Sequence, residues 1–152
     1  MARLQVAGLA TGSHSISAFY AGDASDQPAS SQSTTVTVAA PVAELNDANL
    51  SGMNLSGYDL AGADLTIANL SGADLSGADL ANANQTGANL TKANLSGANL
   101  SGANLTLAKL NFANLSGAKL IFTNLTGANL KGANLKGAVL FGIVGTPRNL
   151  PK

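Results

Sequence analysis

The chain has 152 residues, with eight basic and eight acidic side chains and a net charge of zero at pH 7. It contains no cysteine, which excludes disulfides and thiolate metal sites. It also has no run of eighteen apolar residues, so no membrane span is expected. Only 4% of the residues are aromatic. A compact globular core usually uses more aromatic side chains, because each buries a large area. The composition therefore favours a core built from small and aliphatic side chains rather than the aromatic-rich core of a compact globular domain.

The first forty residues have the pattern of β-strands. His14, Ile16 and Ala18 alternate with polar or differently facing neighbours, as in a strand of a sheet. Residues 34–38 (Thr-Thr-Val-Thr-Val) predict a second strand, because β-branched residues favour extended chain. Pro41 cannot continue a ladder of backbone hydrogen bonds. We therefore predict a short β-rich unit over residues 1–40.

This unit resembles the closing strands of a bacterial immunoglobulin-like repeat. The resemblance implies a secreted or cell-surface protein, although a cytoplasmic location stays open. A complete sandwich of this type needs about seven strands, and only two or three are present. Either the chain is a fragment of a longer protein, or these strands pair with something else.

A five-residue repeat runs from about Ala43 to Leu140. Leu occupies nearly every position numbered in fives, Ala lies two positions earlier, and Asn or Asp comes just before the Leu. On an α-helix, a step of five residues would point successive Leu side chains all round the axis. On a flat strand, an odd step would send them to alternate faces. The chain must therefore bend once per repeat to gather its Leu residues into one core.

The repeat resembles the pentapeptide repeat family, whose consensus is A-(D/N)-L-X-X. This resemblance implies an all-β fold, a right-handed quadrilateral parallel β-helix of about five coils, over residues 41–142. Residues 143–152 (Ile-Val-Gly-Thr-Pro-Arg-Asn-Leu-Pro-Lys) are similar to the tails that cap such arrays. Gln85 is the one departure at the Leu position. We interpret it as a local defect or as an amide satisfied by its neighbours.

Charge is distributed unevenly along the array. The residues from Glu44 to Asp79 include acids but no Lys or Arg, and those from Lys92 onward include bases but no acid. We predict oppositely charged ends, which would attract one another in a head-to-tail assembly. The residues chosen to represent these ends are Glu44, Asp47, Asp59, Lys131, Lys136 and Arg148.

Two further surface features bear on partners. Lys92, Lys109 and Lys131 are predicted to share one face, but three Lys without interleaved aromatic residues make nucleic acid an unlikely partner. Several apolar residues occupy outward corner positions, which suggests a contact belt for a protein partner. These candidate interface residues are Ile67, Leu107, Phe112, Ile121 and Phe122.

Catalysis has little support in the sequence. His14 is the only histidine, and there is no phosphate-binding loop and no nucleophile elbow. We therefore predict a non-enzymatic structural or protein-interaction module without cofactor or metal, with head-to-tail assembly into filaments as an expected extension. The alternative is a regulatory pentapeptide repeat protein that binds a partner such as DNA gyrase by imitating the charge of DNA.

Overall fold

The computed structural model describes residues 3–5, 12–19, 34–38 and 44–151. The chain divides into two compact units, residues 1–40 and 41–152. The division falls at Pro41, which was predicted to end the first unit because proline has no N–H to donate to a β-ladder. Within the described ranges, no helix is long and apolar enough to cross a membrane.

The described residues of the first unit form an antiparallel sheet with the strand order β1-β2-β3. Its strands are β1 (Arg3–Gln5), β2 (Gly12–Phe19) and β3 (Thr34–Val38). In this sheet His14 is paired with Val36, in agreement with the predicted strands. The described strands of this unit form one three-stranded sheet and include no second sheet of a sandwich, so they give no support to the immunoglobulin-like resemblance.

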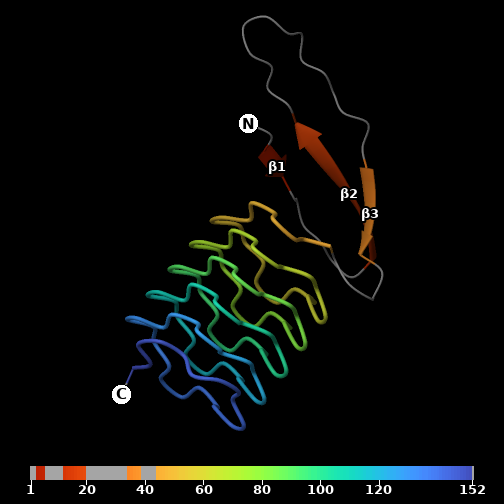
Figure 1. The fold of residues 1–152 in the computed structure, drawn as a ribbon. Helices are drawn as coiled ribbons and strands as arrows, with labels where there is room; N and C mark the ends of the chain where they lie inside the picture. The colour runs from red at the N-terminus through yellow and green to blue at the C-terminus, as the bar shows by residue number, and fades with distance from the viewer. Residues whose placement is uncertain (1–2, 6–11, 20–33, 39–43, 152) are drawn as a thin grey trace, which may run out of the picture. The chain divides into compact units, whose positions relative to one another are not determined.

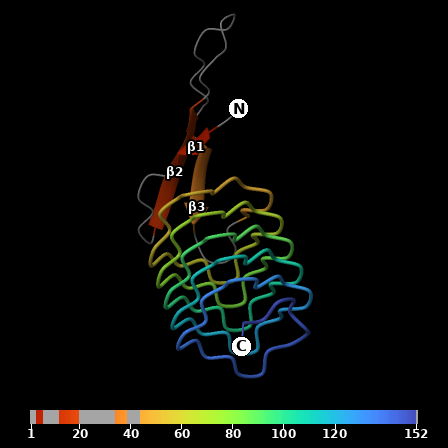
Figure 2. The same cartoon turned by 90° about the vertical axis from the view of Figure 1, so that its left-hand side faces the viewer.

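The second unit is a β-solenoid whose coils stack in chain order, from yellow to blue in Figures 1 and 2. Parallel bridges join residues twenty positions apart, such as Asn49 with Asn69 and Asp74 with Asn94. Because the chain turns every five residues, each coil has four sides. We number the sides 1 to 4 from the first-coil residues Leu45, Leu50, Leu55 and Leu60, and each corner takes the number of the side before it. The right-handed sense of the coil stays a prediction from the family resemblance.

One repeat shows why this sequence bends. The Ser76 amide N–H donates to Asp74 Oδ1 (3.0 Å), and the Ala78 N–H donates to the Leu75 carbonyl oxygen (3.1 Å), which closes a four-residue turn. Gly77 takes a φ of 66°, a left-handed conformation that glycine adopts without steric cost. Between coils, the Leu75 N–H donates to the Asn94 carbonyl oxygen at 2.7 Å. The repeat therefore supplies both the corner and the ladder.

The core is a column of stacked Leu and Ala side chains. From Leu65 to Leu130 every Leu of the repeat is fully buried. Two polar residues share this interior, Gln85 and Thr123. Thr123 Oγ1 donates to the Leu100 carbonyl oxygen at 2.7 Å. Neither polar atom of the Gln85 side chain has a hydrogen-bond partner among the described residues, so the expectation that neighbours satisfy it is wrong.

The tail continues the ladder beyond the last Leu of the repeat. Val144 pairs with Asn124 at the usual spacing of twenty, whereas Arg148 pairs with Asn129, one residue short of it. Three apolar residues lie where the tail begins, Phe141, Ile143 and Val144. Only Ile143 packs against the core, and the other two side chains are exposed. The tail covers the coil mainly through its backbone.

Candidate interaction surfaces

The predicted apolar residues do not form one belt. Ile67 and Leu107 lie on corner 1, Phe112 lies on corner 2, and Ile121 and Phe122 lie on corner 4, diagonally opposite Phe112. Four of the five are exposed, with exposed fractions between 57% and 64%. Ile121 is half-buried instead. The structure therefore distributes these side chains over three corners of the solenoid.

The same four exposed residues share an unusual backbone conformation. Ile67, Leu107, Phe112 and Phe122 have φ values of 60°, 59°, 59° and 55°. This left-handed region costs an L-residue other than glycine roughly 1–2 kcal/mol, and a β-branched residue such as Ile67 is a genuine outlier there. Other coils place glycine at the equivalent position, as at Gly77. In the sequence, this strain is indicated by a large residue at the second corner position of the pentapeptide, where most repeats have glycine.

Each of these side chains lies close to a glycine in the next coil. A Cβ added to Gly132 would come within 2.6 Å of Phe112 Cδ1, and one added to Gly127 would come within 2.9 Å of Leu107 Cδ2. The Phe122 ring meets Phe141 edge-on, with the ring centroids 5.6 Å apart. Each of these four apolar residues thus has glycine twenty residues later, although the pairing is not general, because the left-handed Lys92 is followed at that distance by Phe112.

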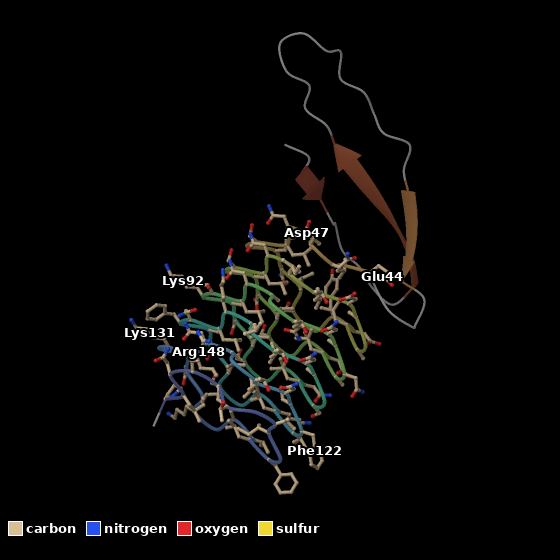
Figure 3. All side chains as sticks on the ribbon, viewed as in Figure 1. Glu44, Asp47, Lys92, Phe122, Lys131 and Arg148 are labelled. Atoms are coloured by element: carbon tan, nitrogen blue, oxygen red, sulfur yellow. The ribbon has the colours of Figure 1, made fainter. Side chains whose placement is uncertain are left out.

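Basic side chains gather on side 2 and its corner. Lys92, Lys109 and Lys131 lie there as predicted from the twenty-residue stacking, and Arg148 joins them. A strict register would have placed Arg148 at an inward Ala position, but the shortened last coil turns it outward, where it is exposed. Figure 3 shows Lys92, Lys131 and Arg148 along one edge of the solenoid. No acidic residue lies on this side in any described coil.

The acids of the solenoid lie in its first two coils, and four of them accept a hydrogen bond from the turn that follows: Asp59, Asp64, Asp74 and Asp79. The Thr66 side chain and then its backbone N–H donate to Asp64 and lower the pKa of that carboxyl group. At Asp74, the Ser76 backbone N–H is the main cause of a lowered pKa, followed by the Ser76 side chain. Both carboxylates are therefore turn acceptors, and nothing in their setting prepares them for proton transfer.

An amide ladder explains part of the charge gradient. Asn94 Nδ2 donates to Asp74 Oδ1 one coil earlier (3.0 Å), and Asn114 Nδ2 donates to Asn94 Oδ1 (3.0 Å). Asp can accept such a bond but has no N–H to donate to the preceding coil. It therefore fits best at the start of a ladder, near the N-terminal end of the solenoid.

The predicted charged ends lie as the register requires. Glu44 and Asp47 are at the N-terminal end of the solenoid, and Lys131 and Arg148 are toward its C-terminal end (Figure 3). Asp59 lies on side 4 of the first coil and Lys136 on corner 3 of the last one. No group of three or more metal-ligating side chains occurs among the described residues. The side chain of His14 is outside what the structure describes.

Three comparisons place this geometry among known proteins. The family model described as pentapeptide repeats matches residues 43–80, 68–106 and 108–142. A pentapeptide repeat protein from the thylakoid lumen of Arabidopsis thaliana is 34% identical, with a TM-score of 0.60 over 61% of this chain and 65% of that protein. The chain thus spans less than two thirds of that relative's length.

Two other solved structures have lower TM-scores. Rfr23, a pentapeptide repeat protein from the cyanobacterium Cyanothece 51142, is 36% identical over 64% of this chain and 87% of its own, with a TM-score of 0.42. The plasmid-mediated fluoroquinolone resistance protein QnrB1 is 25% identical over 60% of this chain and 57% of its own, with a TM-score of 0.31. No curated protein matches the chain.

Proposed function

The chain belongs to the pentapeptide repeat family, and from this premise we propose that it is a non-enzymatic interaction module that assembles with copies of itself. Its outward corners supply lateral contacts, and its two ends supply head-to-tail contacts. A secreted or surface location, which comes from the resemblance of the first forty residues alone, is part of the proposal.

One observation carries the proposal. Ile67, Leu107, Phe112 and Phe122 each have two costs that glycine would avoid, the left-handed conformation of a residue with a side chain and the exposure of that apolar side chain. Backbone strain of this kind persists where the surroundings or a function maintain it. A contact that buries these side chains would offset both costs, whereas glycine at the same positions would avoid them.

The experiment compares the full chain with a variant carrying Leu107→Gly, Phe112→Gly and Phe122→Gly. We expect the variant to stay folded, because glycine suits the left-handed turn, and to sediment as a smaller species at equal concentration. Asn82→Gly is the matched control, since Asn82 has a φ of 58° but no apolar side chain. Unchanged sedimentation of the triple variant would refute the role of the corners.

The dependence of assembly on salt concentration distinguishes the head-to-tail contacts between charged ends from the lateral contacts of the apolar corners. Attraction between the charged ends is screened within about 10 Å at 0.1 M salt, whereas burial of apolar side chains is not weakened by moderate salt. We therefore expect light scattering to report shorter assemblies as the salt concentration rises. A monomer at low salt and high concentration would contradict self-association altogether.

The alternative, regulation of DNA gyrase by charge mimicry, has weaker support. A mimic of DNA needs acidic groups along its whole length, but Lys92, Lys109, Lys131 and Arg148 make one side basic. Inhibition of gyrase supercoiling by low concentrations of the chain would reverse this ranking.

A further inference from the structure

Among the residues that the structure describes, the tail covers only half of the cross-section of the last coil. Leu125 and Leu130, on sides 1 and 2, are fully buried beneath the tail. On sides 3 and 4, Leu135 is partly exposed and Leu140 is 37% exposed, although their counterparts one coil earlier are fully buried. The tail therefore leaves the half coil 133–142 open.

The open half coil also presents free backbone donors. One coil earlier, the Leu115 N–H donates to the Asn134 carbonyl oxygen (2.7 Å) and the Leu120 N–H donates to that of Val139 (2.8 Å). In the last coil the equivalent N–H groups have no backbone acceptor among the described residues. These groups belong to Leu135, Gly137, Leu140 and Gly142. Together they form an unpaired edge of a parallel ladder.

The opposite end presents the matching acceptors. In the second coil, the carbonyl oxygens of Asp64 and Thr66 accept from Leu45 and Asp47 at 2.8 and 2.9 Å. The corresponding carbonyl oxygens of the first coil accept no backbone hydrogen bond from the described residues. They belong to Glu44, Asn46, Asn49 and Ser51, and their sequence spacing is the same as that of the free donors.

We propose that a second copy of the chain seats residues 44–51 on the open half coil 133–142. This joint rests on the proposed self-association and specifies its register. The Glu44 carbonyl oxygen would accept from the Leu135 N–H, and the Asn49 carbonyl oxygen would accept from the Leu140 N–H. Leu45 and Leu50 of the second copy would cover Leu135 and Leu140, and Ala48 would stack on Ala138; Leu45 and Ala48 are partly exposed at their own end.

The position of the tail sets the rotation of the second copy about the solenoid axis. It already occupies the space above sides 1 and 2, so the first side of the second copy cannot continue above side 1. Side 1 of the second copy lies instead above side 3, which is a half turn about the solenoid axis. Residues 54–63 then pass over the tail, where Pro147 and Pro151 have no N–H to donate.

Charge and symmetry agree with this joint. In the proposed register, Asp47 of the second copy lies above Gly137, next to the exposed Lys136, so opposite charges meet. The two surfaces are different, which makes the contact heterologous, and a heterologous contact that does not close produces an open linear assembly. Chains of several copies are the expected product, rather than dimers.

A disulfide can test the register, because the chain has no native cysteine. The joint places Val139 beside Asn49 of the second copy, as Lys119 lies beside Val139 within the chain. Stacked positions are about 4.8 Å apart, within the Cα range of disulfides. The full chain carrying Val139→Cys and Asn49→Cys, both at exposed positions, should form a ladder of covalent multimers on mild oxidation, and the ladder should collapse with reductant.

Two variants serve as matched controls. Val139→Cys with Asp59→Cys would cross-link only if the copies joined without the half turn. Val139→Cys alone would give covalent dimers if two C-terminal ends met. Efficient cross-linking of either control, or none of the Asn49 pair, would overturn the joint. If light scattering still reports association in that case, the proposed function survives; if the chain stays monomeric, both fail.

Discussion

Corner 3 and corner 4 belong to the same coils but carry different residues. Corner 3 repeats Ser-Gly in four coils and has Lys136-Gly137 in the last, whereas corner 4 varies in nearly every coil. In chain order corner 4 reads Ala61-Gly62, Ala81-Asn82, Ser101-Gly102, Ile121-Phe122 and Phe141-Gly142. Corner 3 shows that the fold needs only a residue that tolerates the left-handed turn. The additional side chains of corners 1, 2 and 4 are therefore not required by the fold.

The largest effect that separates the corners is expected from Gly132→Ala. The new Cβ would meet the Phe112 ring at 2.6 Å while φ is +70°. We expect the free energy of unfolding to fall by about 2–3 kcal/mol, the left-handed cost plus displacement of the ring. Gly97→Ala on corner 3, where no atom lies within 4 Å of the new Cβ, should cost only about 1 kcal/mol.

Phe112→Gly provides the second half of this test. In that background the ring is gone, so Gly132→Ala should cost no more than Gly97→Ala does. Urea denaturation of the two single variants and the double variant measures the coupling. Additive effects would show that Phe112 does not rest on Gly132.

A smaller effect in the opposite direction is expected from Ile67→Gly. Ile67 is β-branched and left-handed, and it is 64% exposed. Its replacement should raise the free energy of unfolding by about 1 kcal/mol. Asn82→Gly should gain less, because Asn tolerates this conformation better. Thermal denaturation compares the two, and a loss of stability in the Ile67 variant would show that its side chain stabilises the coil.

The smallest effect concerns acid. Hydrogen bonds from the backbone N–H and then the side chain of Ser76 lower the folded-state pKa of Asp74 below its ordinary value. The resulting stability is present above the unfolded-state pKa and is lost as the pH falls through the folded-state value. Asp74→Asn, which keeps an acceptor oxygen, should therefore lose less stability than the unmodified chain between neutral pH and about pH 2. Parallel pH profiles of the two proteins would contradict this role.

The regular part of the solenoid could be predicted because each pentapeptide has the same inward Ala and Leu and the same turn-forming residues. The burial of Leu75 and the turn at Gly77 follow from one pentapeptide. Gln85 was identified as an exception, but its lack of a partner depends on neighbours from other coils. The separation of Phe112 and Phe122 could be recognised only from the coil length, because they are ten residues apart, which is half a coil, and so lie on opposite corners.

The sequence by itself determined the period, the inward Leu and Ala, and the separation of acids from bases. A five-residue pattern leaves one way to collect these apolar side chains, because other backbone shapes scatter them. Tertiary structure alone decided the outward direction of Arg148 and the open half of the last coil. Both depend on which hydrogen bonds the tail makes with residues twenty positions earlier, and a shift of one residue there exchanges inside for outside.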